Sequence, residues 1–145
     1  MEKRIDIVGL EPNAYKAMMG LEAYLGETTL DASTKELIKI RASQINGCAY
    51  CIQMHTEEAR RLGETEQRIY ALSAWKESPL FTDRERAALS LTDEMTLIAD
   101  DGLSHSSYEA ARQALGDNAL PEAMMQIATI NAWNQLAVAT TMTHD

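Results

Sequence analysis

Apolar side chains recur every three or four residues along almost the whole chain, which is the spacing of one face of an α-helix. Residues 12–26 show it clearly, with Ala14, Met18, Leu21 and Leu25 on one face. No segment alternates apolar and polar residues with the period of a strand, apart from a short arm near the N-terminus. A chain with this pattern is expected to be all-α, a single-domain bundle of about six to seven helices over residues 1–145.

Turn and capping residues divide the pattern into helices. Asn46-Gly47 is a strong C-terminal signal, Ser78-Pro79 closes another segment, and Thr82 with Glu85 forms a capping-box pattern. After an extended N-terminal arm, we therefore expect helices over residues 12–26, 31–46, 48–62, 65–76, 82–99, 104–115 and 121–142.

The charge of the chain excludes some classes of partner. It has 13 Lys and Arg against 22 Asp and Glu, a formal net charge of -9. Such a protein repels polyanions, so we expect no nucleic-acid partner and no membrane partner. The apolar run near the N-terminus is short and is broken by Asp6, so it does not read as a signal peptide, and a cytoplasmic location is expected.

The last expected helix lacks formal charge. From Ala123 to His144 no side chain is formally charged, the terminal histidine aside. Gln126, Asn131, Asn134 and several threonines make this segment too polar for lipid, whereas a buried helix or a subunit interface can satisfy them. Because so small a domain has little room to hide such a face, we expect a homo-oligomer.

Both cysteines lie in the stretch CAYCIQMH, residues 48–55. At about 100° per residue, Cys48, Cys51 and His55 fall on one helical face, which also carries Ala59 and Leu62. The thiols occupy the first turn, where free backbone N–H groups stabilise a thiolate. Their separation on a helix also permits a disulfide, so a reversible dithiol is geometrically feasible.

The spacing suggests roles for these groups. His55 follows Cys51 by one turn and can take the proton of its thiol, whereas the helix dipole favours the more N-terminal Cys48. We predict that Cys51 attacks and Cys48 resolves, with the reverse as the alternative. If the helices on either side of Gly47 form a hairpin, Glu36 lies near His55 and can orient its ring. Alternatively, Glu36 is only a first-turn acid favoured by the dipole.

The pattern of Glu36, eleven residues, Cys48, two residues, Cys51, three residues and His55 resembles the active-site signature of the alkylhydroperoxidase D-like family, within the carboxymuconolactone decarboxylase superfamily. Residues 35–63 are similar to that family's core helical hairpin. INAWNQLAV, residues 130–138, resembles the Asn-x-Trp-Asn stretch of its last long helix.

This resemblance implies an all-helical protomer that forms trimers or hexamers and reduces a hydroperoxide without a cofactor or metal. One cysteine becomes a sulfenic acid, the second condenses with it, and an external dithiol or thioredoxin-like partner restores the pair. Glu36 and His55 form the implied proton relay, with Cys51 and Cys48 as the redox pair. Some members carry a further relay histidine between the cysteines, where this chain has Tyr50.

Three other functions are compatible with parts of the motif. A zinc site would use both cysteines and His55, but a closed site needs a fourth ligand. A carboxymuconolactone decarboxylase-like lyase would use His55 or Glu36 as acid or base and leave the thiols idle. A non-catalytic dithiol that senses oxidation would need the same reactive thiols. His105 and His144 have no neighbouring ligands and are expected at the surface.

Overall fold

The computed structural model describes residues 1–143, and in that range it contains eight α-helices, one 3-10 helix and no strand. The expected all-α class is therefore confirmed. In chain order the elements are α1 Ile7–Leu10, α2 Pro12–Gly26, α3 Ala32–Asn46, α4 Ala49–Arg61, α5 Glu66–Ala71, the 3-10 helix Leu72–Ala74, α6 Asp83–Thr96, α7 Ile98–Asp101 and α8 His105–Ala139.

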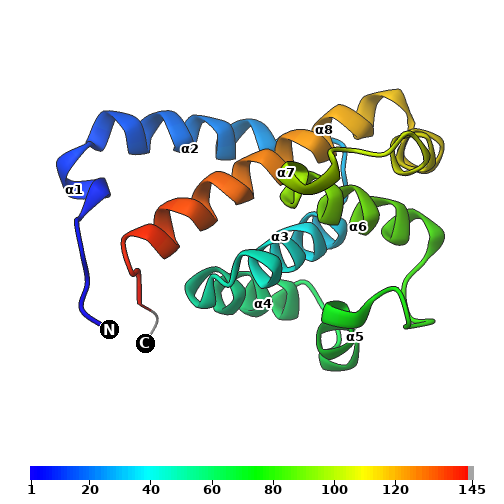
Figure 1. The fold of residues 1–145 in the computed structure, drawn as a ribbon, viewed down its shortest axis with the longest axis horizontal. Coiled ribbons are helices and arrows are strands. Elements are labelled where there is room, and N and C mark those ends of the chain that lie inside the picture. The colour runs from blue at the N-terminus through cyan, green and yellow to red at the C-terminus, as the bar shows by residue number, and fades with distance from the viewer. Residues whose placement is uncertain (144–145) are drawn as a thin grey trace.

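The second part of α8 crosses the molecule, and α8 contacts α2, α3, α4 and α6 (Figure 1). Ile38 of α3, Leu91 of α6 and Ile127 of α8 meet in one core cluster. A second cluster, around Leu37 and Trp75, packs the α5 region against α3 and α6. Because α3 contributes to both clusters, it is held on two sides and provides a rigid base for the segment that follows it.

Local capping interactions set several of the helix ends that the sequence predicts. Asp31 accepts the Thr34 N–H at the start of α3, and Thr82 and Glu85 form the expected capping box at α6. Gly47 ends α3 with a φ of 66°, in the left-handed region that glycine tolerates best. The sharp turn after α3 thus follows from the sequence alone.

Two short segments differ from the sequence prediction. The N-terminal arm is not wholly extended, because the Asp6 carboxylate accepts the Gly9 N–H and starts the single turn α1. The predicted helix over residues 65–76 ends early as α5 and continues as a 3-10 turn, where Trp75 N–H bonds back to Leu72 O.

The C-terminal half of the chain also differs in its boundaries. The helix expected to reach residue 99 ends at Thr96, and the separate turn α7 follows. The last two expected helices are both present within α8, separated by the non-helical Gly116, with φ 82° and ψ 169°, and the second begins before Pro121 rather than at it. A backbone bend with this φ suits glycine and requires no proline.

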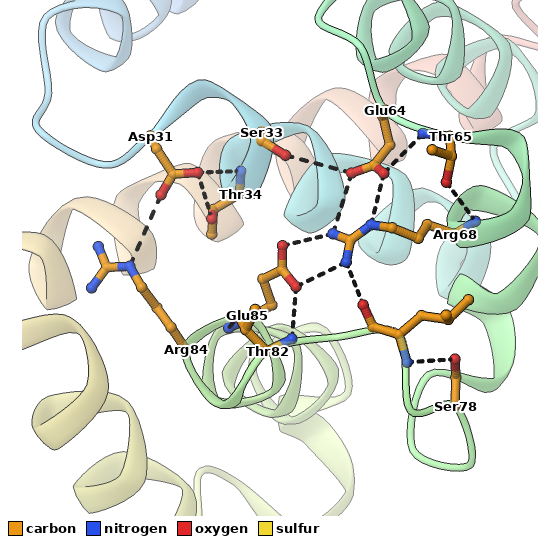
Figure 2. A network of polar contacts seen from close by, with 11 residues as sticks. Asp31, Ser33, Thr34, Glu64, Thr65, Arg68, Ser78, Thr82, Arg84 and Glu85 are labelled. Atoms are coloured by element: carbon orange, nitrogen blue, oxygen red, sulfur yellow. Dashed lines mark hydrogen bonds and ion pairs between the residues drawn. The ribbon is translucent and has the colours of Figure 1, made fainter.

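Arg68 of α5 links the segment that follows α4 to α6 (Figure 2). Its guanidinium lies 2.7 Å from Glu64 and 2.6 Å from Glu85, donates to the Leu80 carbonyl, and lies over the Phe81 ring. Hydrogen bonds to carboxylates on two segments fix the far end of the α3–α4 hairpin against α6.

The two ends of the described chain meet, since the Arg4 N–H donates to the Thr140 carbonyl at 3.1 Å (Figure 1). Among residues 1–143, no helix is long and apolar enough to cross a membrane. His105 is exposed at the start of α8, as expected, and His144 lies outside the described residues.

Candidate active site

Cys48 and Cys51 form a disulfide at the start of α4, with a Cα–Cα distance of 5.3 Å. Cys48 is the N-cap residue rather than a member of the first turn, and its sulfur accepts the Cys51 N–H at 3.2 Å. Only 2% of Cys48 and 3% of Cys51 is exposed. The pair is thus buried, and one sulfur already occupies the place where a helix stabilises negative charge.

The wall around the disulfide comes from a distant part of the chain. Ala137 of α8 packs against both cysteines, with the half-buried Tyr50 beside them. The inward face predicted for α4 continues to the buried Ala59, but Leu62 is 48% exposed. That part of the prediction is wrong, since Leu62 is the C-cap residue of α4 and lies at the surface.

His55 lies beside Glu36, as the hairpin register predicts. Its Nδ1 is 3.2 Å from Oε2 of Glu36, although the ring N–H does not point squarely enough at that oxygen for a well-formed hydrogen bond. We therefore treat the contact as an electrostatic pair. With Nδ1 facing the carboxylate, Nε2 is left as the nitrogen that can accept a proton.

Glu36 is far more buried than an ordinary first-turn acid, with 5% of the residue exposed. Its second oxygen, Oε1, accepts a 2.6 Å hydrogen bond from Lys39, a residue outside the pattern of Glu36, Cys48, Cys51 and His55. Burial alone raises the pKa of Glu36, but the contact with His55 and the Lys39 charge outweigh it. The pKa of Glu36 is therefore lowered from 4.5, and the group is a carboxylate at neutral pH.

A chain of polar side chains joins α8 to α3 near this pair. Asn46 donates to the side-chain oxygens of Asn131 and Asn134, and Asn134 donates to Ser43. Ser43 in turn donates to the Lys39 carbonyl at 2.6 Å. The asparagines of the Asn-x-Trp-Asn stretch thus fix the turn of α3 that carries the partner of Glu36, a link that sequence alone did not reveal.

The arrangement suits thiol redox chemistry. Within the described part of the chain, no three His, Cys, Asp or Glu side chains gather as a metal-binding group. The structure places the four residues expected from the sequence on the α3–α4 hairpin as two pairs, the disulfide and the Glu36–His55 pair. The structure adds two contacts to these pairs: Lys39 binds Glu36, and Ala137 packs against the cysteines.

A helical hairpin that carries a buried Cys-x-x-Cys disulfide next to a histidine–carboxylate pair defines an alkylhydroperoxidase D-like protein. The sequence profile of the carboxymuconolactone decarboxylase family matches residues 12–94. The chain belongs to this family, and the resemblance seen in the sequence is confirmed.

Individual relatives agree with this assignment. The uncharacterised protein YdfG of Bacillus subtilis is 40% identical over 139 residues, which cover 96% of this chain and 95% of YdfG. A crystal structure from Agrobacterium tumefaciens, of a protein of unknown function suggested to be the antioxidant defence protein AhpD, superposes with a TM-score of 0.96. It is 40% identical, and 99% of each chain is covered.

A more distant structure, of an uncharacterised peroxidase-related protein from Silicibacter sp. TM1040, has a TM-score of 0.79 and 25% identity. The match covers 90% of this chain and 69% of that one.

Proposed function

We propose that the protein is a thiol-dependent peroxidase that reduces hydroperoxides through its Cys48–Cys51 pair, in antioxidant defence. The observation that carries this proposal is the buried disulfide at the start of α4, followed one turn later by His55 in contact with the buried Glu36 carboxylate. The family and the antioxidant description suggested for its Agrobacterium relative support it.

In the oxidative step, His55 Nε2 accepts the thiol proton of Cys51, and the thiolate attacks the terminal oxygen of ROOH. The O–O bond breaks, Cys51 becomes a sulfenic acid, and the leaving alkoxide takes the proton from His55 to become ROH. The Cys48 thiol then attacks the sulfenic sulfur, so that the disulfide forms and one water leaves. Peroxide is reduced by two electrons, and the two thiols are oxidised by two.

In the reductive step, an external dithiol or thioredoxin-like partner attacks the disulfide and leaves as a disulfide itself. Attack at Cys51 releases Cys48 as the thiolate, which the Cys51 N–H is already placed to stabilise. This supports Cys51 as the sulfur that reacts with external molecules and Cys48 as the internal partner. Tyr50 packs beside the pair, at the position where some family members carry a relay histidine.

Assembly into a homo-oligomer, a trimer or hexamer, and a cytoplasmic location belong to the same proposal. Ile5, Leu10 and Met19 are large apolar side chains that lie exposed on the N-terminal arm, α1 and α2, and such exposed apolar side chains support contact with a further protein chain. A reducing compartment would supply the dithiol that each catalytic cycle consumes.

The test is consumption of hydrogen peroxide and of an alkyl hydroperoxide with dithiothreitol as reductant, comparing wild type with Cys51→Ser, Cys48→Ser and His55→Gln. We expect Cys51→Ser to abolish turnover and His55→Gln to lower the rate by about a hundredfold or more. Cys48→Ser should form no internal disulfide and turn over only by direct reduction of its Cys51 sulfenic acid by dithiothreitol.

Met54 lies on α4 next to His55 but is exposed, so Met54→Leu is a matched control that should keep full activity. Undiminished turnover by Cys51→Ser would refute the assignment of the attacking thiol. A wild-type protein whose reduced thiols do not react with either peroxide would refute the peroxidase proposal.

A further inference from the structure

The cysteine pair is closed to the reductant that it needs. Both cysteines are buried, and Ala137 of α8 packs against them. Thiol–disulfide exchange requires the sulfur of the incoming thiolate to come into contact with one of the two bonded sulfurs. A segment that covers the pair must therefore move before the disulfide can be reduced.

The α3–α4 hairpin is the fixed side of this site. The Cys48 N–H bonds the Ser43 carbonyl of α3, and α3 contributes to both core clusters. The helix α8 is anchored to the same turn as far as Asn134, which is fully buried and donates to the Ser43 hydroxyl. Beyond Asn134, the polar contacts of α8 with other segments among residues 1–143 are made to the N-terminal arm. The end of α8 is therefore the side of the site that can move.

A few hydrogen bonds, here called the terminal clasp, join residues 2–4 to the end of α8 (Figure 1). The Arg4 N–H lies 3.1 Å from the Thr140 carbonyl and 3.2 Å from the Thr141 hydroxyl. The Arg4 guanidinium donates to the Ala139 carbonyl at 3.1 Å, and the Thr141 hydroxyl donates to the Glu2 carbonyl at 2.6 Å. Because Glu2 and Arg4 are exposed, water competes for these bonds, and the clasp can open at a small cost.

Thr141 has a strained backbone that the clasp holds in place. The Thr141 and Met142 N–H groups bond back to the Val138 and Ala137 carbonyls, as in a helix end that turns through a left-handed residue. Glycine is the usual residue at such a turn, whereas Thr141 has a φ of 53° despite its branched side chain. Its hydroxyl supplies two contacts of the clasp, which glycine would lack. The turn next to Ala137 thus depends on the contacts between the two ends.

We propose that residues 135–143 form a cover over the cysteine pair, which opens when the terminal clasp releases, and that the disulfide is reduced in the open form. Opening takes Ala137 away from the sulfurs while Asn134 stays bonded to Ser43. One thiolate of an external dithiol then attacks Cys51, and Cys48 leaves as the thiolate. The second thiol of the reductant releases Cys51 and closes the reductant's own disulfide, so that two electrons and two protons pass to the cysteines.

This inference rests on the proposed function, because it assumes that the disulfide is reduced in every catalytic cycle. It concerns access to the disulfide and not the reaction with peroxide. The two can therefore be tested separately.

The experiment measures how fast dithiothreitol reduces the disulfide of the oxidised protein at pH 7 without peroxide. Free thiols are alkylated with N-ethylmaleimide at each time point and counted by mass spectrometry. Arg4→Ala removes the guanidinium of the clasp, and Thr141→Val removes its hydroxyl while keeping the branched shape. Each should raise the rate constant about fivefold, which corresponds to the net contribution of a typical hydrogen bond.

Three control variants separate the clasp from other effects. Thr141→Ser keeps the hydroxyl and should reduce at the wild-type rate, although it changes the side chain more in volume than Thr141→Val does. Arg112→Ala removes an exposed guanidinium that pairs with Glu109 on α8, and it should also leave the rate unchanged. Asp93→Ala removes the partner of Arg41 on α6, so it lowers overall stability without touching the clasp.

Unchanged reduction rates in both Arg4→Ala and Thr141→Val would overturn the cover. An acceleration in Asp93→Ala as large as in the clasp variants would also overturn it, because the disulfide would then be reached by unfolding of the whole chain. Should one clasp variant fail to fold, the other carries the test. A wild type without peroxide turnover refutes the proposed function, whereas clasp variants that are not accelerated refute this inference alone.

Discussion

Replacing Asp93 should destabilise the protein more than any surface charge would, because its carboxylate joins three elements. Oδ1 accepts from Arg41 Nε at 2.7 Å, while Oδ2 accepts from Arg41 Nη2 at 3.2 Å and from Trp75 Nε1 at 3.1 Å. Asp93 is only 8% exposed. In Asp93→Ala, a mostly buried guanidinium and a buried indole N–H lose their acceptor together.

The size of the effect follows from these contacts. Removing one partner of a buried ion pair costs about 3–5 kcal/mol, because the remaining charge stays desolvated. The Arg41 side chain keeps 17% exposure and still reaches the Ser73 carbonyl at 3.3 Å, which places the cost at the lower end. We expect the free energy of unfolding to fall by about 3 kcal/mol, or about 1.5 M in the urea midpoint if m is about 2 kcal/mol/M.

Equilibrium urea unfolding at pH 7 is the assay, at one protein concentration and with the disulfide intact in every variant. Glu109→Ala, which breaks the exposed pair with Arg112, is the control and should not shift the midpoint measurably. The double variant Arg41→Met with Asp93→Leu should be more stable than Asp93→Ala, since no buried charge is left unpaired. Equal midpoints for these two variants would refute the reasoning.

Three further predictions concern the site and its hairpin. Asn134→Leu should lower the free energy of unfolding by about 1–3 kcal/mol, because Asn46 and Ser43 lose a buried partner; urea unfolding measures it. Gly47→Ala should lower the free energy of unfolding by about 1–2 kcal/mol, because alanine disfavours the positive φ at this position and nothing lies within 4 Å of the added Cβ. Thermal unfolding measures this loss, and a clearly larger loss would mean that the added methyl group also clashes. The pKa of Glu36 is lowered in the folded state, so its carboxylate contributes stability above about pH 4.5 that is lost as the pH falls further. Wild type should therefore lose stability relative to Glu36→Gln between pH 4.5 and 3, and parallel curves would contradict this.

The parts of the fold that the sequence predicts well are those set by neighbouring residues. The caps at Asp31 and Thr82 and the stop at Gly47 depend on contacts within one turn, so local residue types suffice. Lys39 was within reach of the same reasoning, because a Glu and a Lys three residues apart on a helix pair routinely.

Other features required the assembled structure. The break between the two helices of α8 lies at Gly116, which takes a positive φ while the flanking residues remain helical. The neighbouring residues do not indicate which of the glycines and prolines in this segment interrupts the helix. The asparagine link between α3 and α8 depends on how two distant helices cross, and periodicity within either helix carries no information about that crossing.

The sequence by itself determined the all-α class, the hairpin around Gly47 and the spacing that sets Cys51, His55 and Glu36 in one region. These follow from helical periodicity and turn chemistry, which act over a few residues. Only the tertiary structure decided that Ala137 packs against the buried cysteines. It also decided that Lys39 and His55 each contact one oxygen of Glu36. Burial and charge balance depend on which distant surfaces meet, and it is these that turn a Cys-x-x-Cys pattern into a defined chemical environment.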